Sequence, residues 1–218
     1  MTPLTRVLLA LTFVTGIVDA VSFLALGQVF SAMQTGNVIF LGFGLAGTAD
    51  APTAAPLVAL GAFLLGGGAA GLLARQEARL EGSGIGPALA GEVALLAAAA
   101  VIAVAVDIDR GHFSAYLLIA MLSLAMGLRN TVVRGFAGPN LATTVLNLSL
   151  STMTMHAPLS LATGEDLGER AGGFVAILAG AAAGALLLRV TPALPLATAA
   201  AVTLVAALTR LRITPRAA

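Results

Sequence analysis

Residues 7–26 read VLLALTFVTGIVDAVSFLAL, an apolar stretch with a single ionisable residue, Asp19. A helix of about 20 residues spans about 30 Å, which is the thickness of the hydrocarbon core of a bilayer. The stretch is longer than the apolar part of a secretory signal peptide, and more apolar sequence follows the aspartate. We therefore expect residues 7–26 to form the first membrane span and to remain in the protein.

Similar runs recur along the chain of 218 residues, of which 59% are hydrophobic and 10% are charged. Soluble domains carry about 25% charged residues. The further runs are residues 54–74, 88–106 and 172–188, with shorter ones at 114–128 and 194–209. They leave no room for a soluble domain, so we expect one all-α integral membrane domain over residues 1–218, a polytopic helix bundle. With no cysteine and no dense basic run, we expect no disulfide, metal site, cofactor or nucleic-acid partner.

The number of spans depends on two further segments, residues 38–46 and 141–157. The first is too short to cross a bilayer, and the second contains seven Ser, Thr and Asn residues. If neither crosses, six spans place nine of the 11 basic residues, all arginines, on the cytoplasmic side; if both cross, eight spans place six there. The positive-inside rule favours six spans plus two short broken or re-entrant segments. The preference weakens if Arg129 and Arg134 are functional rather than topological.

The order of these elements repeats once, in halves of about residues 1–110 and 111–218. PAL at 87–89 opens the last span of the first half, and PAL at 192–194 opens the last span of the second. Just before each, residues 64–75 echo residues 178–189. Three spans in each half would invert the second half relative to the first, whereas eight spans would make the halves parallel. Inverted repeats are typical of transporters, whose substrate sites lie where the repeats meet at broken helices.

Polar turns interrupt the first apolar stretch of each half: GIVDA at 16–20 and MQTGN at 33–37, then AMGLRN at 125–130 followed by Thr143 and Thr144. On these motifs the chain resembles the YoaK-like family of small bacterial membrane proteins, a domain of unknown function. The resemblance covers essentially the whole chain and implies an integral membrane protein, without naming a substrate. The family usually has Thr where this chain has Gln34, so a polar side chain is kept.

Asp19 is the first candidate for a substrate-binding site, because an ionisable side chain inside a span is costly and faces a partner or an aqueous cavity. Its functional role would be that of a proton-linked carboxylate or a ligand. Its structural role would be an ion pair with Arg129 or Arg134, or a cap where the helix restarts. A shift of 111 residues pairs Asp19 with Asn130, a neutral second candidate.

The starts of the two short segments supply the next candidates: Gln34, Thr35, Gly36 and Asn37 for the first, Thr143 and Thr144 for the second. Thr and Asn are good N-caps, and Gly permits close backbone approach. A half-helix that begins there points free N–H groups and the positive end of its dipole inward, which favours an anion or a carboxylate. Ordinary capping without a ligand is the alternative.

Three charged residues near these turns have two interpretations each. Arg129 and Arg134 could hold an anion with their planar guanidinium groups or anchor their helix at the interface. We favour the anchor for Arg134 and leave both interpretations open for Arg129. Glu92 lies five residues after Pro87. We expect it near the membrane surface, where it complements the helix dipole, with a transport role as the less favoured alternative.

Together these features predict a transporter or channel for a small polar or anionic solute, in the bacterial inner membrane with both termini cytoplasmic. The alternatives are a scaffold or accessory subunit and, less favoured, an intramembrane enzyme. The spans contain no Ser–His pairing, no HExxH and no paired metal carboxylates, so we expect no enzymatic activity. The Gly-x-x-x-Gly motifs at 67–71 and 180–184 are expected to pack one repeat on the other, or two copies into a homo-oligomer.

Overall fold

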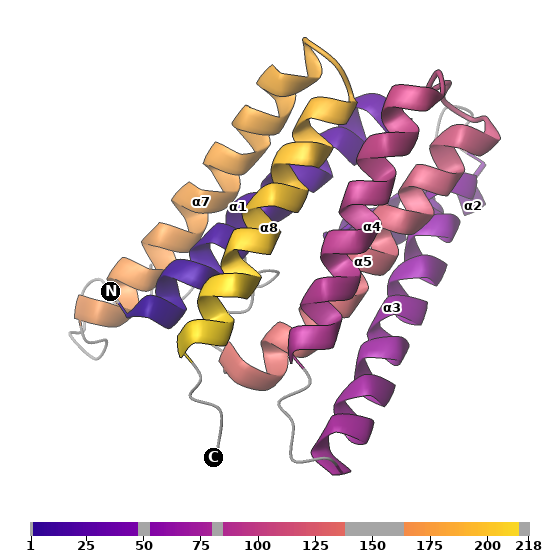
Figure 1. Ribbon diagram of the computed structural model, residues 1–218. Coiled ribbons are helices and arrows are strands. Elements are labelled where there is room, and N and C mark those ends of the chain that lie inside the picture. Colours follow the sequence, from indigo (N-terminus) through magenta and orange to yellow (C-terminus); the bar gives the residue numbers. More distant parts are fainter. Residues whose placement is uncertain (1, 48–52, 80–84, 138–163, 214–218) are drawn as a thin grey trace.

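The computed structural model describes residues 2–47, 53–79, 85–137 and 164–213, which form helices and no strand (Figure 1). The helices are α1 (Pro3–Val21), the π-helix η1 (Ser22–Gly27), α2 (Gln34–Leu45), α3 (Ala54–Arg79), α4 (Ile85–Ala105), α5 (Phe113–Ala137), α7 (Gly164–Leu188) and α8 (Ala193–Ile213). The expected all-α class is therefore confirmed for this part of the chain.

Five helical stretches are long and apolar enough to cross a membrane: Pro3–Gly27, Ala54–Gln76, Gly86–Ala105, Phe113–Val133 and Ala171–Leu188. The apolar part of α8, Ala193–Thr209, is somewhat shorter. The chain is thus a polytopic helical membrane protein. The short segment expected at 38–46 is α2, whose 12 residues reach about 18 Å. The other, residues 141–157, lies outside the described residues.

Helix α1 begins and ends with clear local signals. The Thr2 side chain caps it by accepting a hydrogen bond from the Thr5 N–H at 3.1 Å, and Pro3 follows at the first helical position. The π-helix η1 continues its path and ends at Gly27, and the next residue, Gln28, is left-handed with φ 55°. Because a left-handed residue stops a helix, the chain turns there and runs through residues 28–33, here called the connector, into α2.

The long helices form two groups, visible side by side in Figure 1. The first helix group is α1, α7 and α8, and the second is α3, α4 and α5. The most extensive contact in the first group is between α1 and α7, and in the second group it is between α3 and α5. The groups meet mainly through α4 and α8, while α5 also touches α1 and η1. Helix α2 packs on α3.

Glycines allow the closest helix contacts, because a side chain would collide with the backbone of the neighbouring helix. A Cβ at Gly16 of α1 would meet the Ile177 carbonyl of α7, and one at Gly180 would meet the Phe13 carbonyl. Between α3 and α5, Gly66 faces the Leu124 carbonyl in the same way, and Gly127 faces the Phe63 carbonyl. Close backbone approach at small residues is a general mode of helix packing in lipid.

The two Gly-x-x-x-Gly motifs are used to different extents inside the chain. Gly180 and Gly184 both face α1, and Gly67 lies against the Thr131 side chain of α5. A Cβ at Gly71 would have nothing within 4 Å. Packing between helices of the two halves therefore uses most of these positions, and homo-oligomer formation remains a prediction.

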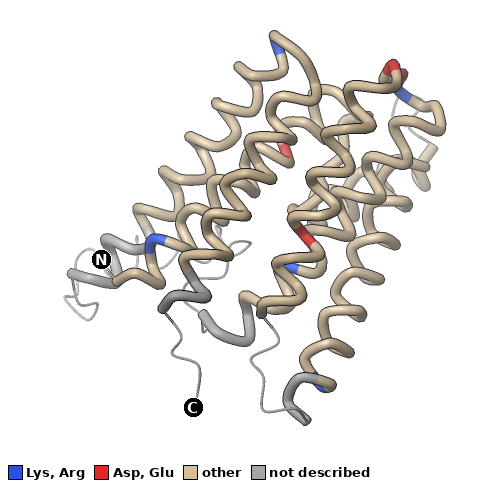
Figure 2. Tube along the Cα trace, viewed as in Figure 1, with Lys and Arg blue, Asp and Glu red and all other residues tan. Residues whose placement is uncertain are grey.

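Charge and hydropathy are arranged as expected for contact with a bilayer. Figure 2 shows largely uncharged helices between the two ends of the bundle. Arg6 and Arg75 lie near the end where α1 starts and α3 ends, whereas Arg110 and Arg189 lie beyond the ends of α4 and α7 at the opposite end. Apolar side chains cover the outer faces, as with Leu64, which is 70% exposed. These faces contact lipid.

Candidate functional site

A buried ion pair lies where the two helix groups meet. Glu92 of α4 and Arg129 of α5 approach to 3.1 Å between Oε1 and the guanidinium. Both are almost fully buried, at 0% and 1% exposure, and Glu92 is the only charged residue of α4. Removing one partner of such a pair costs about 3–5 kcal/mol, because the other is left as an uncompensated buried charge.

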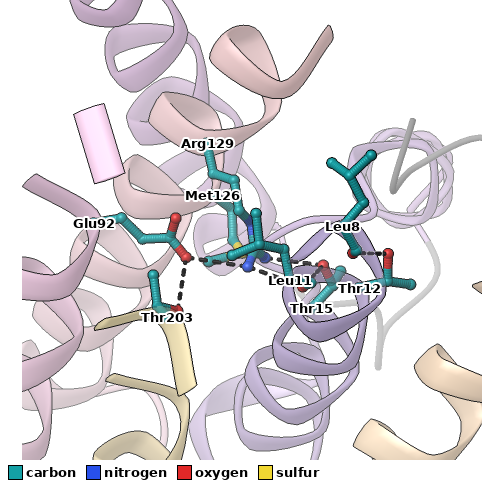
Figure 3. Close-up of polar contacts among 8 residues, drawn as sticks. All are labelled: Leu8, Leu11, Thr12, Thr15, Glu92, Met126, Arg129 and Thr203. Atoms are coloured by element: carbon teal, nitrogen blue, oxygen red, sulfur yellow. Dashed lines mark hydrogen bonds and ion pairs between the residues drawn. The ribbon is translucent and has the colours of Figure 1, made fainter. Parts of the chain in front are cut away.

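Arg129 also binds the first helix group (Figure 3). Its guanidinium donates to the Leu11 carbonyl at 3.0 Å and to the Thr15 hydroxyl at 2.9 Å, both on α1, and contacts the Met126 sulfur. Thr203 of α8 donates to Glu92 Oε1 at 3.4 Å. We call Glu92, Arg129, Thr15, Thr203 and the Leu11 carbonyl the bridge network. It joins helices α1, α4, α5 and α8 across the group boundary.

Asp19 lies one helical turn beyond Thr15 on α1, a rise of about 6 Å. Its Oδ1 atom accepts the N–H groups of Ser31 and Ala32 at 2.9 and 2.8 Å, so it fastens the connector to α1. Beside it, the Ser22 and Ser31 hydroxyls share a hydrogen bond of 2.6 Å. The second carboxyl oxygen, Oδ2, is buried without a hydrogen-bond partner among the described residues.

Asn37 fastens the other end of the connector. Its side chain accepts the Phe30 N–H at 2.9 Å and donates to the Phe30 carbonyl at 2.6 Å and to Gln34 Oε1 at 2.7 Å. Gln34 in turn donates to the Ser31 carbonyl at 2.9 Å. We call Asp19, Ser22, Ser31, Gln34 and Asn37 the connector network. The amides satisfy backbone groups that would otherwise be unpaired within the bundle.

The sequence-predicted candidates fall into three sets. Asp19, Gln34 and Asn37 come together around the connector, and Arg129 belongs to the bridge network. Thr35 is exposed, Gly36 packs against the Phe30 ring, and Asn130 is half-buried on α5. Thr143 and Thr144 lie outside the described residues, as does the side chain of Arg134.

The start of α2 and the partner of Glu92 differ from expectation. Helix α2 begins at Gln34, so Thr35 and Asn37 lie in its first turn and do not cap it; Asn37 is instead occupied with the Phe30 backbone. Glu92 is fully buried and pairs with Arg129 of α5, so its observed role is in an ion pair between helices. The expectation that it lies near the membrane surface stays a prediction. Arg129, equally buried, does not anchor its helix at an interface.

Sequence reasoning missed Thr15, Ser22, Ser31 and Thr203 as members of these networks. Glu92 could have been found as an acid in an otherwise apolar run, the same signal that indicates Asp19. The hydroxyl residues carry no such signal, because Ser and Thr are common in membrane helices, where the hydroxyl can donate a hydrogen bond to a backbone carbonyl of the preceding turn. Thr12, for example, donates to the Leu8 carbonyl at 2.9 Å.

A hollow of about 400 Å³ opens beside η1, at the end of the bundle where α5 starts. Its lining includes the apolar Leu26 and the polar Gln28, Thr53, Arg110 and Tyr116. Its volume lies within the range of small-molecule sites, although the hollow is open to its surroundings. The described residues contain no group of three or more His, Asp or Glu side chains that could hold a metal ion.

The comparisons with known proteins agree on the kind of protein. The profile of a family described as "Protein of unknown function (DUF1275)" matches residues 7–209. The chain belongs to this family. The "UPF0700 transmembrane protein YoaK" of Bacillus subtilis (strain 168) is 30% identical over 139 residues, 63% of this chain and 60% of that protein. The chain thus matches less than two thirds of this relative's length. No solved structure matches.

The resemblance to the YoaK-like family is therefore confirmed, on the scale of the whole bundle. The DUF1275 profile runs from Val7 in α1 to Thr209 in α8. It contains every described residue of the bridge network and of the connector network. Both networks thus lie in the region by which this family is defined.

Proposed function

We propose that this DUF1275 protein is a secondary transporter for a small polar or anionic solute. One observation carries the proposal: charged and polar side chains are buried where two groups of largely apolar helices meet, beside the connector. Burying charge in a membrane protein is costly, and such residues usually serve a transport pathway. We assign it no enzymatic reaction, since the buried carboxyls are engaged in ion pairing and in holding backbone amides.

The proposal includes an internal, inverted repeat. A shift of 111 residues carries Gly16 onto Gly127, and a shift of 114 carries Gly66 onto Gly180. The same shifts carry the partner carbonyls onto one another: Phe13 onto Leu124 and Phe63 onto Ile177. The contact of α1 with α7 thereby repeats as the contact of α5 with α3, which supports an approximate two-fold relation between the halves.

Six spans, including α8, fit this relation. Three spans in each half make the halves inverted. The ends of α1 and α3 that carry Arg6 and Arg75 would then face the cytoplasm, together with the end of α8. Both termini would be cytoplasmic, in the bacterial cell membrane.

We further propose a path for the solute. The hollow lined by Gln28, Arg110 and Tyr116 lies where the chain turns back into the connector. The connector is held by Asp19, and the bridge network lies about one helical turn further along α1. A solute entering the hollow would reach the boundary between the helix groups, and their relative movement would open the path to the other side.

The test is solute flux in liposomes that contain the purified protein. Carboxylates, amino acids, amines and nucleobases are screened with and without a pH gradient, for wild type, Asp19→Asn, Glu92→Gln and the matched loop variant Asp107→Asn. We expect one solute class to be carried by wild type and Asp107→Asn, with at least tenfold loss in the other two. Absence of flux across the panel, with stable protein that co-purifies with one partner, would favour the scaffold alternative.

A further inference from the structure

We propose that Asp19 binds and releases one proton, and that this proton is the coupling ion of the transport step. The assignment of the proton to coupling rests on the proposed function. Binding forms an O–H bond at Oδ2 with a proton from the aqueous phase on one side of the membrane, and release breaks that bond and delivers the proton to water on the other side. The Asp19 side chain thereby alternates between a carboxylate and a neutral acid.

The proposal begins with an imbalance of buried charge. Among the described residues, three ionisable side chains are buried: Asp19, Glu92 and Arg129. Two carboxyls thus share one guanidinium. Arg129 makes its ion pair with Glu92, and no ion pair with Asp19 is formed in the described part of the chain. A second buried carboxylate without a paired cation is costly, and taking up a proton removes that cost.

The hydrogen bonds at Asp19 permit both states. Oδ1 accepts the N–H groups of Ser31 and Ala32, whether the group is charged or neutral. Oδ2, without a partner among the described residues, can carry the proton without breaking either bond. A dehydrated metal cation needs several oxygen ligands. The nearby Ser22 and Ser31 hydroxyls bind each other, and Ser22 also donates to the Val18 carbonyl, so a proton fits the site better.

The surroundings of α1 leave few other groups to set this charge. Helix α5 contributes Arg129, and α4 contributes Glu92 through it. Residues 171–188 of α7 and 193–209 of α8 contain no ionisable side chain, and neither do η1 and the connector. The Arg110 guanidinium also donates to the Leu24 carbonyl of η1. Among the described residues, the state of Asp19 therefore depends on the Glu92–Arg129 pair, on Arg110 beside η1 and on its own proton.

The position of Asp19 gives the proton a mechanical effect. Hydrogen bonds to a charged acceptor are roughly twice as strong as those between neutral groups. Protonation would weaken the two bonds that fasten the connector, and deprotonation would tighten them again. The connector leads into α2, so proton binding acts directly on the re-entrant segment beside the hollow.

The experiment is infrared difference spectroscopy on the full-length protein in lipid, as the pH is changed. Wild type is prepared once with carboxyl-labelled ¹³C-aspartate and once with the corresponding glutamate. We expect a protonated-carboxyl band at pH values where ordinary exposed carboxyls are ionised, above about pH 5, and this band should shift with labelled aspartate and not with labelled glutamate. A band in this pH range that shifts only with glutamate, or no band in this range, would overturn the proposal. This measurement needs no substitution, so a folding failure cannot obscure it.

Two variants assign the band to its residue. Asp19→Asn should lose it, while Asp107→Asn, in an exposed loop, should keep it. Retention in Asp19→Asn would contradict the assignment. The spectroscopic band and the solute flux test different proposals. A band without flux would support the proton site and contradict the transporter, whereas flux without a band would support the transporter and contradict the proton site.

Discussion

The bridge network and the connector network both lie among apolar helices, yet they satisfy their polar groups in different ways. The bridge network pairs opposite charges, Glu92 and Arg129, from two helices of the second group and ties them to α1 and α8 of the first. The connector network uses Asp19 and Asn37 to bind backbone groups of a short irregular segment. The bridge network joins separate helices, and the connector network fastens residues 28–33 to the helices on either side of them in the chain.

The difference matters for how the molecule can move. Breaking the bridge network removes the contacts of the second helix group with α1 and α8 and leaves an uncompensated charge inside the second group, so it should affect the whole bundle. Breaking the connector network releases only residues 28–33 and the short helix that follows. Substitutions in the two networks should therefore differ in the size and reach of their effects, and the following predictions test this.

The largest effect is expected for Arg129→Met, which leaves Glu92 buried without a counter-ion. The free energy of unfolding should fall by about 3–5 kcal/mol, measured by denaturant unfolding in detergent. The double variant Glu92→Gln with Arg129→Met should recover a substantial part of this loss, because no lone charge remains. Equal instability of the single and double variants would contradict the charge explanation.

Next in size is Gly16→Leu, which affects the helix shared by both networks. The added side chain would collide with the α7 backbone at Ile177, and overpacking of this kind costs about 3 kcal/mol. Gly71→Leu is the matched control, because no atom of another described helix lies within 4 Å of a Cβ at that position. Thermal unfolding should separate the two, and a similar loss in both would argue against close packing of α1 on α7.

A smaller and local effect is expected for Asn37→Ala. The Phe30 N–H and carbonyl would lose their side-chain partner, at a cost of about 1–3 kcal/mol for unsatisfied buried groups. Hydrogen exchange should accelerate in residues 28–37 and remain unchanged in α4 and α8. The control Thr35→Ala, at an exposed neighbour, should change neither stability nor exchange. Acceleration throughout the bundle would show that the connector network is not local.

The smallest effect is expected for Thr203→Val. The hydroxyl is 3.4 Å from Glu92, which already has Arg129 as its partner, so the loss should stay below about 1 kcal/mol. A double-mutant cycle with Thr15→Val would measure whether the two hydroxyls act together on the ion pair. A loss as large as that of Arg129→Met would mean that α8 is held mainly by this one bond.

The sequence predicts the helices well because each apolar run is long enough to indicate a span by itself. It also predicts that Asp19 makes polar contacts inside the bundle, since an isolated acid in an apolar run needs a partner. It cannot place Glu92, because the distance along the chain from Pro87 says nothing about which helix covers that face. Pairing with Arg129 depends on how α4 packs against α5, and the Thr15 and Thr203 contacts depend on packing across the two groups.

Helix α2 presents apolar side chains outward, including Val38, Phe43 and Leu45, and its 12 residues reach about 18 Å. Lipid beside it therefore meets a hydrophobic length much shorter than its own hydrocarbon core, a mismatch that a bilayer relieves by thinning. Thicker membranes raise this cost at α2, whereas the long helices match the bilayer. We therefore expect acyl-chain length to act as a mechanical load on one short helix, which the connector would transmit to Asp19.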